Sequence, residues 1–349
     1  MRFEDMRFGV LGCGSYGVVH AKVISSMPDR ARLVAVADAA PGRAAAVAEE
    51  LGCEAVESLD DLCRRTDIDA ITVSIPHGLH ADAVVAALEA GKHVLVEKPL
   101  DISLEAADRV IEAERRTGLT VGVMSQRRFE PAAVRIKAAI EAGELGRLTS
   151  GVAETTSWRP QSYYDSTAWR GTAAIEGGGA LMTLGVHSLD LLLWFMGEPV
   201  SVQAQAGQLA HERIEVEDTL VGTVRFASGA VAGVSATTAA YPGRDSRVAV
   251  YGDLGSGQVG ERKLGYLRTT AEQPGAERVG ATAAYPEHSA LSGGDGIDIY
   301  GAAQAQYRDF VEAVRDGRAP AIGTADGRRV LATVLGLYES ARTGDTVKL

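Results

Sequence analysis

Through residue 126, the chain alternates short apolar runs with longer segments in which apolar residues recur at helical spacing. The apolar runs predict strands buried on both faces, and the periodic segments predict helices. The predicted strands are 8–11, 32–37, 70–75, 92–97 and 119–124, and the predicted helices are 16–27, 41–51, 59–65, 80–89 and 104–117. This alternation is typical of a doubly wound parallel sheet with helices on both faces. We therefore predict an α/β domain over residues 1–126.

The pattern changes in the remainder of the chain, residues 127–349. After a predicted helix at 131–142, strand-like runs follow one another through short turns, at 148–156, 200–208, 218–226, 230–239 and 247–251. Consecutive strands of this kind predict an antiparallel sheet. Further helices are predicted at 179–195, 302–315 and 326–343, whereas the glycine-rich stretch 252–301 has no clear pattern. We predict a second, α+β domain with an open, mainly antiparallel sheet.

Composition and charge narrow the class of protein. The 349 residues suffice for two sizeable cores. A formal net charge of −11 without any basic cluster argues against nucleic acid or an anionic membrane as a partner. No segment approaches about 18 uninterrupted apolar residues, and MRFEDMRFG lacks the apolar core of a signal peptide, so we expect a cytoplasmic protein. No grouping of His, Cys and Asp has metal-site spacing, so we expect no metal.

A glycine-rich turn, GCGSYG, lies between the first predicted strand and the first predicted helix. Gly12, Gly14 and Gly17 allow a tight turn, close approach of the backbone to a pyrophosphate, and tight packing of the strand against the helix. The helix N-terminus then offers N–H groups and the positive end of its dipole to the phosphates. A glycine turn alone is commonplace, but its position between a strand and a helix favours a dinucleotide site.

Asp38 ends the second predicted strand, about 20 residues after the last glycine of the turn. An acid at this position accepts hydrogen bonds from the ribose hydroxyls of the adenosine. It also repels a 2′-phosphate, which favours NAD over NADP as the cofactor. Arg43 follows closely in the sequence and softens that repulsion.

The second informative motif, Glu97-Lys98-Pro99, closes the predicted strand 92–97. Lys98 therefore stands at the carboxyl end of a parallel strand, where open α/β sheets bind their ligands. To act near neutrality, its pKa must fall by roughly 3, and burial near a partly positive nicotinamide ring acts in that direction. Glu97 opposes this unless its carboxylate points elsewhere, for example toward the nicotinamide ribose. Pro99 is a candidate for a cis peptide bond. The alternative is a surface lysine that merely follows a strand.

The predicted helix 179–195 is apolar nearly all round, which predicts that it is buried. Thr183, His187 and Asp190 are spaced four and three apart, so they share one helical face. A polar stripe on a buried helix needs protein partners or a ligand. Glu176 and three glycines precede the helix, and we expect them to leave its N-terminal N–H groups available. The alternative is a core histidine with satisfied hydrogen bonds; the glycines and Lys98 favour a site.

Further polar residues complete the set of candidates. Beyond the glycines and Asp38, the predicted cofactor-binding residues are Ser15, Tyr16, Ser74, Pro76, His77, His80, Glu97, Lys98 and Gln126. The predicted substrate-binding residues are Thr183, Arg128, Tyr164, Trp169 and Arg170. Aromatic and guanidinium groups suit a polyhydroxylated ring, although core packing explains them equally well. The clustered acids Glu215, Glu217 and Asp218 are expected in a solvated loop.

Taken together, these motifs resemble those of the Gfo/Idh/MocA oxidoreductases, the family of glucose–fructose oxidoreductase and inositol dehydrogenase. The matching segments are GCGSYG, Asp38, Pro76 with His80, GKHVLVEKP at 91–99, EGGGALMTLGVHSLD at 176–190 and the closing helix through ESARTG, so the resemblance covers nearly the whole chain. It implies an N-terminal Rossmann domain that binds NAD or NADP and a C-terminal domain on an open antiparallel sheet that binds a sugar or cyclitol. It also implies a homodimer or homotetramer formed through the exposed face of that sheet.

The resemblance further implies that Lys98 is the catalytic lysine and His187 the catalytic histidine. The family's usual aspartate, four residues before the histidine, is Thr183 here. A hydroxyl positions an oxygen but does not stabilise an imidazolium, so more of the proton transfer would fall to Lys98. We expect hydride transfer between NAD and a secondary carbinol carbon, with Thr183 hydrogen-bonded to a neighbouring oxygen. Two alternatives stay open: a redox-assisted glycosidase or lyase with tightly bound NAD, and a non-catalytic dinucleotide-binding protein.

Overall fold

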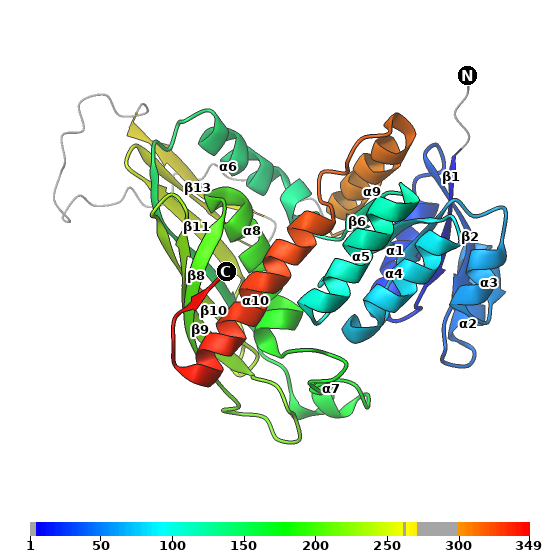
Figure 1. Cartoon of the computed structure of the whole chain (residues 1–349), viewed down its shortest axis with the longest axis horizontal. Coiled ribbons are helices and arrows are strands. Elements are labelled where there is room, and N and C mark those ends of the chain that lie inside the picture. The colour runs from blue at the N-terminus through cyan, green and yellow to red at the C-terminus, as the bar shows by residue number, and fades with distance from the viewer. Residues whose placement is uncertain (1–4, 261–262, 271–298) are drawn as a thin grey trace. The chain divides into compact units, whose positions relative to one another are not determined.

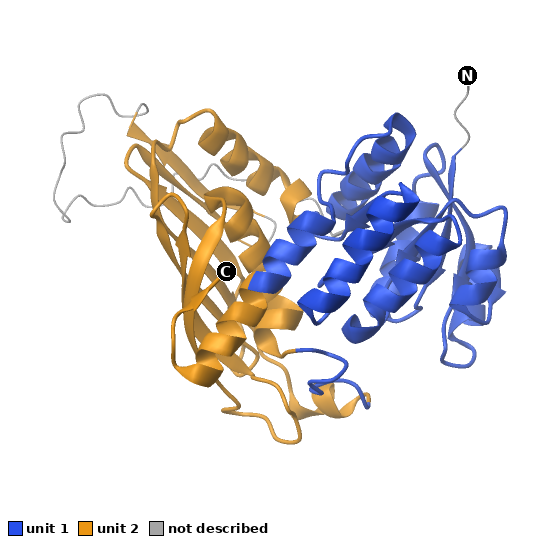
Figure 2. Ribbon diagram, viewed as in Figure 1, with its two compact units in different colours: residues 1–126, 168–177, 299–332 blue, residues 127–167, 178–298, 333–349 orange. Residues whose placement is uncertain are grey.

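The computed structural model describes residues 5–260, 263–270 and 299–349 (Figure 1). They fall into two compact units (Figure 2). Unit 1 contains Met1–Gln126, Ala168–Gly177 and Ile299–Ala332, and unit 2 contains Arg127–Thr167, Gly178–Asp298 and Thr333–Leu349. The break after Gln126 is where the sequence pattern divides the chain. Two segments that we assigned to the second domain, 168–177 and 299–332, belong to unit 1.

Unit 1 is built on a six-stranded parallel sheet with the strand order β3-β2-β1-β4-β5-β6. This is the order of a Rossmann sheet, which confirms the predicted fold class. The strands are β1 (Met6–Leu11), β2 (Ala31–Ala37), β3 (Glu54–Val56), β4 (Ala70–Val73), β5 (His93–Val96) and β6 (Val121–Val123). The helices are α1 (Ser15–Ser25), α2 (Arg43–Leu51), α3 (Leu59–Arg64), η1 (His77–Leu79), α4 (His80–Glu89), α5 (Leu104–Thr117), α9 (Ile299–Asp316) and the first part of α10 (Thr324–Thr343).

The core of unit 1 draws on a distant part of the chain. Helix α9 packs on α1, and Tyr307 and Phe310 enter the cluster around Phe8. The ring of Phe8 lies 5.5 Å from that of Tyr307 and 6.3 Å from that of Phe310. All three side chains are buried. Helix α9 is therefore part of the nucleotide-binding fold, because its apolar face completes that core.

Unit 2 is built on an eight-stranded sheet with the strand order β13-β12-β11-β7-β10-β9-β8-β14. Neighbouring strands are antiparallel except β7 and β10, which are parallel, so the sheet is mainly antiparallel as predicted. The strands are β7 (Leu148–Thr156), β8 (Pro199–Gly207), β9 (Thr219–Phe226), β10 (Val231–Thr237), β11 (Arg247–Gly252), β12 (Gly255–Val259), β13 (Leu264–Thr269) and β14 (Val347–Lys348). The helical segments are α6 (Pro131–Glu141), α7 (Gln161–Asp165), η3 (Leu181–Gly185) and α8 (Val186–Met196).

The two faces of the unit 2 sheet differ in their covering. Helix α8 packs on β7 and β11, and α6 packs on β12 and β13 (Figure 1). Along β9, burial alternates residue by residue, so every second side chain faces away from the core. Strands β12 and β13 lie in the stretch 252–301 that showed no clear pattern, and residues 271–298 of it lie outside the described residues.

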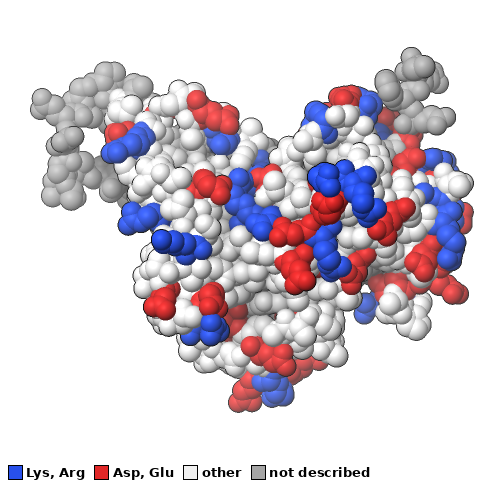
Figure 3. Space-filling view, viewed as in Figure 1, with Lys and Arg blue, Asp and Glu red and all other residues white. Residues whose placement is uncertain are grey.

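Charged side chains of both signs are mixed over the face seen in Figure 3. Many exposed basic groups lie in ion pairs, as Arg109 does with Asp82 at 2.8 Å and Arg116 with Glu89 at 2.7 Å. Among the helices that the structure describes, none has an apolar stretch long enough to cross a membrane.

Candidate active site

Close backbone contacts shape the glycine turn between β1 and α1. Gly12 has a φ of +96°, and a Cβ there would lie 2.0 Å from the carbonyl oxygen of Ser74. A Cβ on Gly17 would lie 1.8 Å from the carbonyl oxygen of Gly12. Gly14 differs from both, because a Cβ there would meet no described atom within 4 Å. The turn therefore needs glycine twice for its own shape, and its middle position leaves room for a ligand against the backbone.

Helix α1 begins directly after this open position. No side chain of the described residues caps its N-terminus, and the side chains of Ser15 and Tyr16 are exposed there. A helix start of this kind presents backbone N–H groups and the positive end of the helix dipole. The turn and the helix start together fit the pyrophosphate of a dinucleotide.

The Asp38 carboxylate lies beside the glycine turn, at the end of β2. Its Oδ2 accepts a hydrogen bond from the Cys13 N–H at 2.6 Å, and its Oδ1 accepts one from the Ala40 N–H at 2.7 Å. Each carboxylate oxygen has a second lone pair, so Asp38 can also accept hydrogen bonds from ribose hydroxyls. These donors and acceptors fit the adenosine half of NAD.

Two alanine substitutions in the glycine turn are expected to distinguish the glycine that the turn needs for its conformation from the glycine that contacts the cofactor. Gly17→Ala should lower the free energy of unfolding by about 1–3 kcal/mol, because the methyl group meets fixed backbone. Gly14→Ala should change that free energy by less than about 0.5 kcal/mol and still weaken NAD binding on the order of tenfold. Chemical denaturation and calorimetric titration with NAD measure the two effects. Unchanged NAD affinity in Gly14→Ala would remove Gly14 from the cofactor site.

Ser74, Pro76 and Gln126 also stand at the carboxyl ends of strands in unit 1, where parallel sheets bind ligands. Ser74 follows β4 and donates its N–H to the Leu11 carbonyl at 2.8 Å, and Pro76 precedes η1. Gln126 begins η2 (Gln126–Phe129), and its buried Oε1 has no hydrogen-bond partner among the described residues. A buried amide oxygen without a partner is costly, so a ligand donor fits this position.

Lys98 lies just beyond β5, and its side chain is partly exposed. Burial lowers the pKa of its amine, while the carboxylates of Glu97 and Glu176 act in the opposite direction. The Lys98–Pro99 peptide bond is cis, as predicted. The Glu97 carboxylate accepts a hydrogen bond from His20 Nε2 at 2.9 Å and another from the Lys98 N–H at 3.1 Å. Both of its oxygens thus have partners within the protein.

The two histidines of the turn after β4 differ in their surroundings. His77 Nδ1 donates to the Glu176 carbonyl at 2.9 Å, and burial is the main reason why its pKa falls to about 3. A neutral ring bonded in this way keeps a lone pair on Nε2 and can accept a hydrogen bond. His80 is fully buried, with Nδ1 2.8 Å from the Pro99 carbonyl and Nε2 2.9 Å from the Ile75 carbonyl. His80 thus joins the turns that follow β4 and β5, and its contact with the cofactor stays a prediction.

The segment 168–177 adds groups that the sequence pattern did not bring together. Glu176 is buried, and its carboxylate lies close enough to raise the pKa of Lys98. The Trp169 ring lies 6.5 Å from that of His77, and the Arg170 guanidinium lies 4.8 Å from the centre of the Trp169 ring. Trp169 and Arg170 therefore lie in unit 1 near His77. The only sequence signal for Glu176 was its position before the three glycines.

In unit 2, the segment that carries His187 begins with a π-helical turn, η3, and continues as α8. Thr183 and His187 are partly exposed, whereas most of their neighbours along the helix are buried. The Thr183 hydroxyl donates a hydrogen bond to the Gly179 carbonyl at 2.8 Å. Asp190 follows His187 by three residues within α8, and its side chain is buried.

The three glycines before η3 let other groups of unit 2 approach closely. A Cβ on Gly178 would lie 2.3 Å from the Tyr338 hydroxyl, and one on Gly179 would lie 1.7 Å from the Glu217 carbonyl oxygen. The Glu217 carboxylate accepts the N–H groups of Gly179 and Leu181, each at 2.8 Å, and the Tyr338 hydroxyl at 3.0 Å. The helix start is therefore capped from within the protein, contrary to our expectation of available N–H groups.

The expectation of a solvated acidic loop was wrong for Glu217 and Asp218. Both side chains are buried, and burial raises the pKa of Glu217. Their signal in the sequence, a short run of acids, does not distinguish a buried cap from a surface loop. Glu217 caps the start of the His187 segment because the loop that carries Glu217 returns to that place in the fold.

Arg128 is tied to Asp190 rather than left open for a ligand. Its Nε and Nη2 donate to the two carboxylate oxygens of Asp190 at 2.8 and 2.5 Å. Both side chains are buried, and the guanidinium lies 5.7 Å from the centre of the Trp194 ring. The pair fixes α8 to η2, so the structure gives Arg128 a role in holding the His187 segment.

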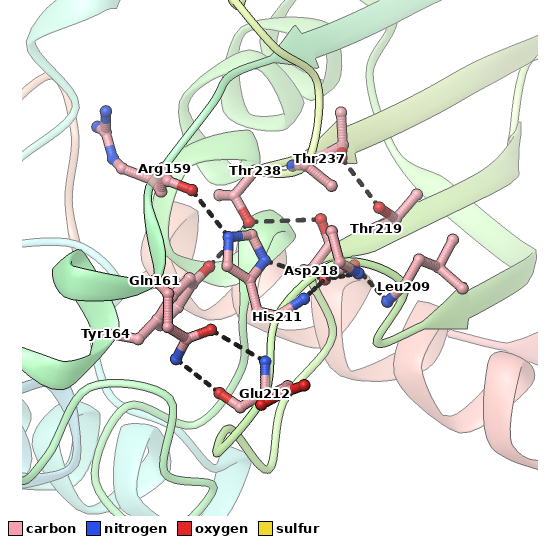
Figure 4. Close-up of polar contacts among 12 residues, drawn as sticks. Arg159, Gln161, Tyr164, Leu209, His211, Glu212, Asp218, Thr219, Thr237 and Thr238 are labelled. Carbon is pink, nitrogen blue, oxygen red and sulfur yellow. Dashed lines mark hydrogen bonds and ion pairs between the residues drawn. The ribbon is translucent and has the colours of Figure 1, made fainter.

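Tyr164 lies in a buried polar cluster of unit 2 (Figure 4). Its hydroxyl is 2.8 Å from Thr238 Oγ1, and its ring packs edge-on against the His211 ring at 4.8 Å. His211 contacts Asp218 through Nδ1 at 3.0 Å and the Arg159 carbonyl through Nε2 at 2.8 Å. This cluster favours the core-packing interpretation of Tyr164 over substrate binding.

The electrostatics of the cluster follow from its backbone donors. Burial of Asp218 opposes ionisation most strongly, yet the N–H groups of Leu209 and Ala210, together with His211, lower its pKa (Figure 4). The two N–H groups lie 2.9 and 2.8 Å from the carboxylate. An ionised Asp218 therefore fixes the loop between β8 and β9.

Comparison with known proteins agrees with this geometry. Residues 6–125 match the model of an oxidoreductase family with an NAD-binding Rossmann fold, and residues 133–258 match the GFO/IDH/MocA C-terminal domain. An inositol 2-dehydrogenase of Rhizobium meliloti (strain 1021) is 34% identical over 257 residues, which are 72% of this chain and 74% of that protein.

Solved structures give the same result over nearly the whole chain. The WlbA dehydrogenase from Bordetella pertussis, in complex with NADH and UDP-GlcNAcA, is 30% identical with a TM-score of 0.86, and the match covers 99% of each chain. A levoglucosan dehydrogenase in complex with NADH and levoglucosan is 25% identical with a TM-score of 0.88 and the same coverage. The chain therefore belongs to the GFO/IDH/MocA family and is an NAD-dependent oxidoreductase.

Proposed function

We propose that this enzyme oxidises a secondary hydroxyl of a cyclitol or a small sugar to the ketone. The observation that carries the proposal is the partly exposed side chain of Lys98 at the carboxyl end of β5, in the same parallel sheet as the glycine turn. Burial lowers the pKa of its amine. Two relatives of this chain support this class of substrate. One is named inositol 2-dehydrogenase, and the solved structure of the other contains levoglucosan.

In the proposed reaction, NAD supplies the acceptor for the hydride that leaves the carbinol carbon. The neutral Nζ of Lys98 takes the proton from the hydroxyl oxygen, and a carbonyl group forms. The His77 ring stays neutral, because its pKa is about 3. Its Nε2 can therefore accept a hydrogen bond from the bound cofactor or substrate. Trp169 and Arg170 lie near His77 in unit 1 and extend the polar surface there. For unit 2, we propose His187 as the catalytic histidine and Thr183 as a hydrogen-bond partner of a substrate oxygen.

A panel of substrates tests the proposal directly. Inositols, free sugars and nucleotide sugars are each incubated with the protein and with NAD or NADP, and the absorbance of the reduced cofactor is followed. We expect net NADH formation with an inositol or a free sugar. Glycoside cleavage without net NADH, or turnover of nucleotide sugars alone, would overturn the assignment.

The Asp38 carboxylate is expected to set the choice between NAD and NADP. Wild-type protein should bind NAD more tightly than NADP, because the carboxylate accepts ribose hydroxyls and repels a 2′-phosphate. Asp38→Asn should narrow the ratio of the two Kd values, with NAD affinity lowered on the order of tenfold. Arg43→Ala is the matched control and should widen the ratio, since it removes a nearby positive charge. Calorimetry with both cofactors measures the Kd values of all three proteins, and wild-type NADP affinity equal to that for NAD would contradict this role of Asp38.

We also propose a homodimer or homotetramer in which the outer face of the unit 2 sheet is the contact surface. Val221 on β9 and Val231 on β10 are 59% and 45% exposed on strands whose alternate residues are buried. The strand register puts Val221 and Val231 on the same face of the sheet, where a second copy of the chain could cover them. Sedimentation velocity of wild-type protein and of a Val221→Lys variant tests the proposal, and a monomeric wild type would refute it.

A cytoplasmic location is proposed on the state of the three cysteines. Cys13, Cys53 and Cys63 are all free thiols in the structure. Disulfides are rare in the cytosol, where thiols stay reduced, so three free cysteines suit that compartment. Fractionation of cells that express the protein checks the location.

A further inference from the structure

A chain of four buried polar side chains in unit 1 ends at the carboxylate that precedes Lys98. It starts at Thr72 in β4, passes through Tyr307 in α9 and His20 in α1, and reaches Glu97 after β5. The oxygen and nitrogen atoms are separated by 2.9 Å between Thr72 and Tyr307, 3.1 Å between Tyr307 and His20, and 2.9 Å between His20 and Glu97. The exposed fractions are at most 7%. No step of the proposed reaction uses the first three residues.

The acceptor chemistry gives every bond in this chain a direction. An ionised carboxylate only accepts hydrogen bonds, so His20 Nε2 donates to Glu97 Oε1. One imidazole tautomer then leaves Nδ1 as the acceptor for the Tyr307 hydroxyl. The Tyr307 oxygen in turn accepts the hydroxyl hydrogen of Thr72. Each donor finds one acceptor, which is the arrangement that makes a buried polar network rigid.

The result of the network is a carboxylate held at both oxygens. Glu97 Oε1 is bonded to His20, and Oε2 accepts the backbone N–H of Lys98 at 3.1 Å. An ionised carboxylate that is free to turn would approach the Lys98 amine and favour its ammonium form. A fixed carboxylate keeps its distance from that amine constant.

We propose that His20 and Tyr307 are positioning residues that hold the Glu97 carboxylate in place, so that it does not close onto the Lys98 amine and Lys98 stays able to exchange a proton. This inference rests on the proposed role of Lys98 in proton transfer. It makes helix α9, far along the chain, a working part of the site at the end of β5.

The charged and titratable groups around these residues set the expected effects. Glu97 and Glu176 favour the ammonium form of Lys98, and burial opposes it. Near Glu97 itself lie the rings of His20, His77, His80 and Tyr307. Burial raises the pKa of Tyr307 far above its ordinary value, so its hydroxyl keeps its hydrogen and remains a donor.

Two matched pairs of variants of the full chain test the inference. Tyr307→Phe removes the donor to His20 and keeps the ring that packs on Phe8, whereas Thr72→Val removes a hydroxyl from the same chain but leaves that donor in place. His20→Met removes the donor to Glu97, whereas His20→Gln keeps an N–H at the end of the side chain. If Tyr307→Phe does not fold, the two His20 variants decide the matter alone.

The first measurement is the pH dependence of Lys98 acetylation, quantified by mass spectrometry without substrate, which gives the pKa of Lys98 independently of turnover. Tyr307→Phe and His20→Met should raise this pKa on the order of one pH unit and should move the rising limb of the kcat profile up the pH scale by a similar amount. Thr72→Val and His20→Gln should match the wild type.

Several outcomes would overturn the inference. The first is an unchanged or lowered pKa of Lys98 in both Tyr307→Phe and His20→Met. The second is an equal shift of that pKa in Thr72→Val, which would indicate a general packing effect. If Lys98→Met abolishes turnover while these variants show no shift, the inference fails and the proposed function stands. If Lys98→Met turns over like the wild type, the proposed function itself fails.

Discussion

Replacing Lys98 with methionine is expected to lower kcat by about 10²–10⁴-fold, the usual contribution of a positioned proton acceptor. Methionine keeps most of the length and bulk of the side chain and removes only the amine. The Kd for NAD should stay close to the wild-type value, because the pyrophosphate and adenosine contacts belong to the glycine turn and Asp38. Steady-state kinetics with the substrate found in the panel, together with calorimetric titration of NAD, measure both quantities.

The pH dependence of the same reaction follows from the direction of the Lys98 pKa shift. Lysine accepts a proton only as the neutral amine, and burial lowers the pKa of Lys98 below its ordinary value. The neutral form, and with it kcat, should therefore rise with pH through that lowered pKa and level off above it. The residual activity of Lys98→Met should lack this rising limb.

Lys92 provides a matched control in the same unit. Its ammonium group donates hydrogen bonds to the carbonyls of Arg65 and Ile68 at 2.6 and 2.9 Å, so it holds backbone rather than substrate. Lys92→Met should lower the free energy of unfolding and leave kcat near the wild-type value at temperatures where the protein is folded. Wild-type turnover in Lys98→Met would return Lys98 to the alternative of a lysine that merely follows a strand.

The second large effect is expected on stability, from removal of the Asp190 carboxylate. Asp190→Ala leaves the Arg128 guanidinium buried without its bidentate partner. Breaking a buried ion pair on one side typically costs about 3–5 kcal/mol. Chemical denaturation followed by circular dichroism should show a loss of that size in the free energy of unfolding of unit 2.

The double variant Arg128→Met with Asp190→Leu is the control for this prediction. Apolar side chains of similar volume remove both charges together, so most of the lost stability should return. If Asp190→Ala costs less than about 1 kcal/mol, the pair contributes as little as a surface ion pair, and Arg128 becomes available as a substrate-binding residue.

Local patterns in the sequence were enough for the parts of this protein whose structure depends on neighbours along the chain. The alternation of apolar runs and helical segments predicted the parallel sheet, because strand and helix periods are properties of short stretches. The glycine turn with Asp38 predicted the NAD site, since a strand, a turn and a helix start make that site almost alone. Lys98 became a candidate because a residue at the end of a parallel strand lies at the ligand-binding edge wherever the sheet is placed.

Local sequence patterns did not predict the short or irregular elements. Strands β3 and β14 span only a few residues, and β12 and β13 are rich in glycine or lack strict alternation, so pairing with longer neighbours decides their conformation. The π turn before His187 is another case. Its sequence predicts an ordinary buried helix, whereas the structure has a π-helical turn at Leu181–Gly185 before α8.

Only the tertiary structure decided which distant groups meet. Glu217 caps the start of the His187 segment, and Tyr307 reaches Glu97 through His20, although nothing near these residues in the sequence marks them as partners. Likewise, 168–177 and 299–332 joined unit 1 after the pattern had assigned them to the second domain. The physical reason is that a local pattern tells whether a side chain is buried, while the identity of its partner depends on how the whole chain returns to that place. Thus the sequence determined the cofactor, the sheet and the position of Lys98 at the end of a parallel strand, and the tertiary structure determined the buried network that joins Thr72, Tyr307, His20 and Glu97.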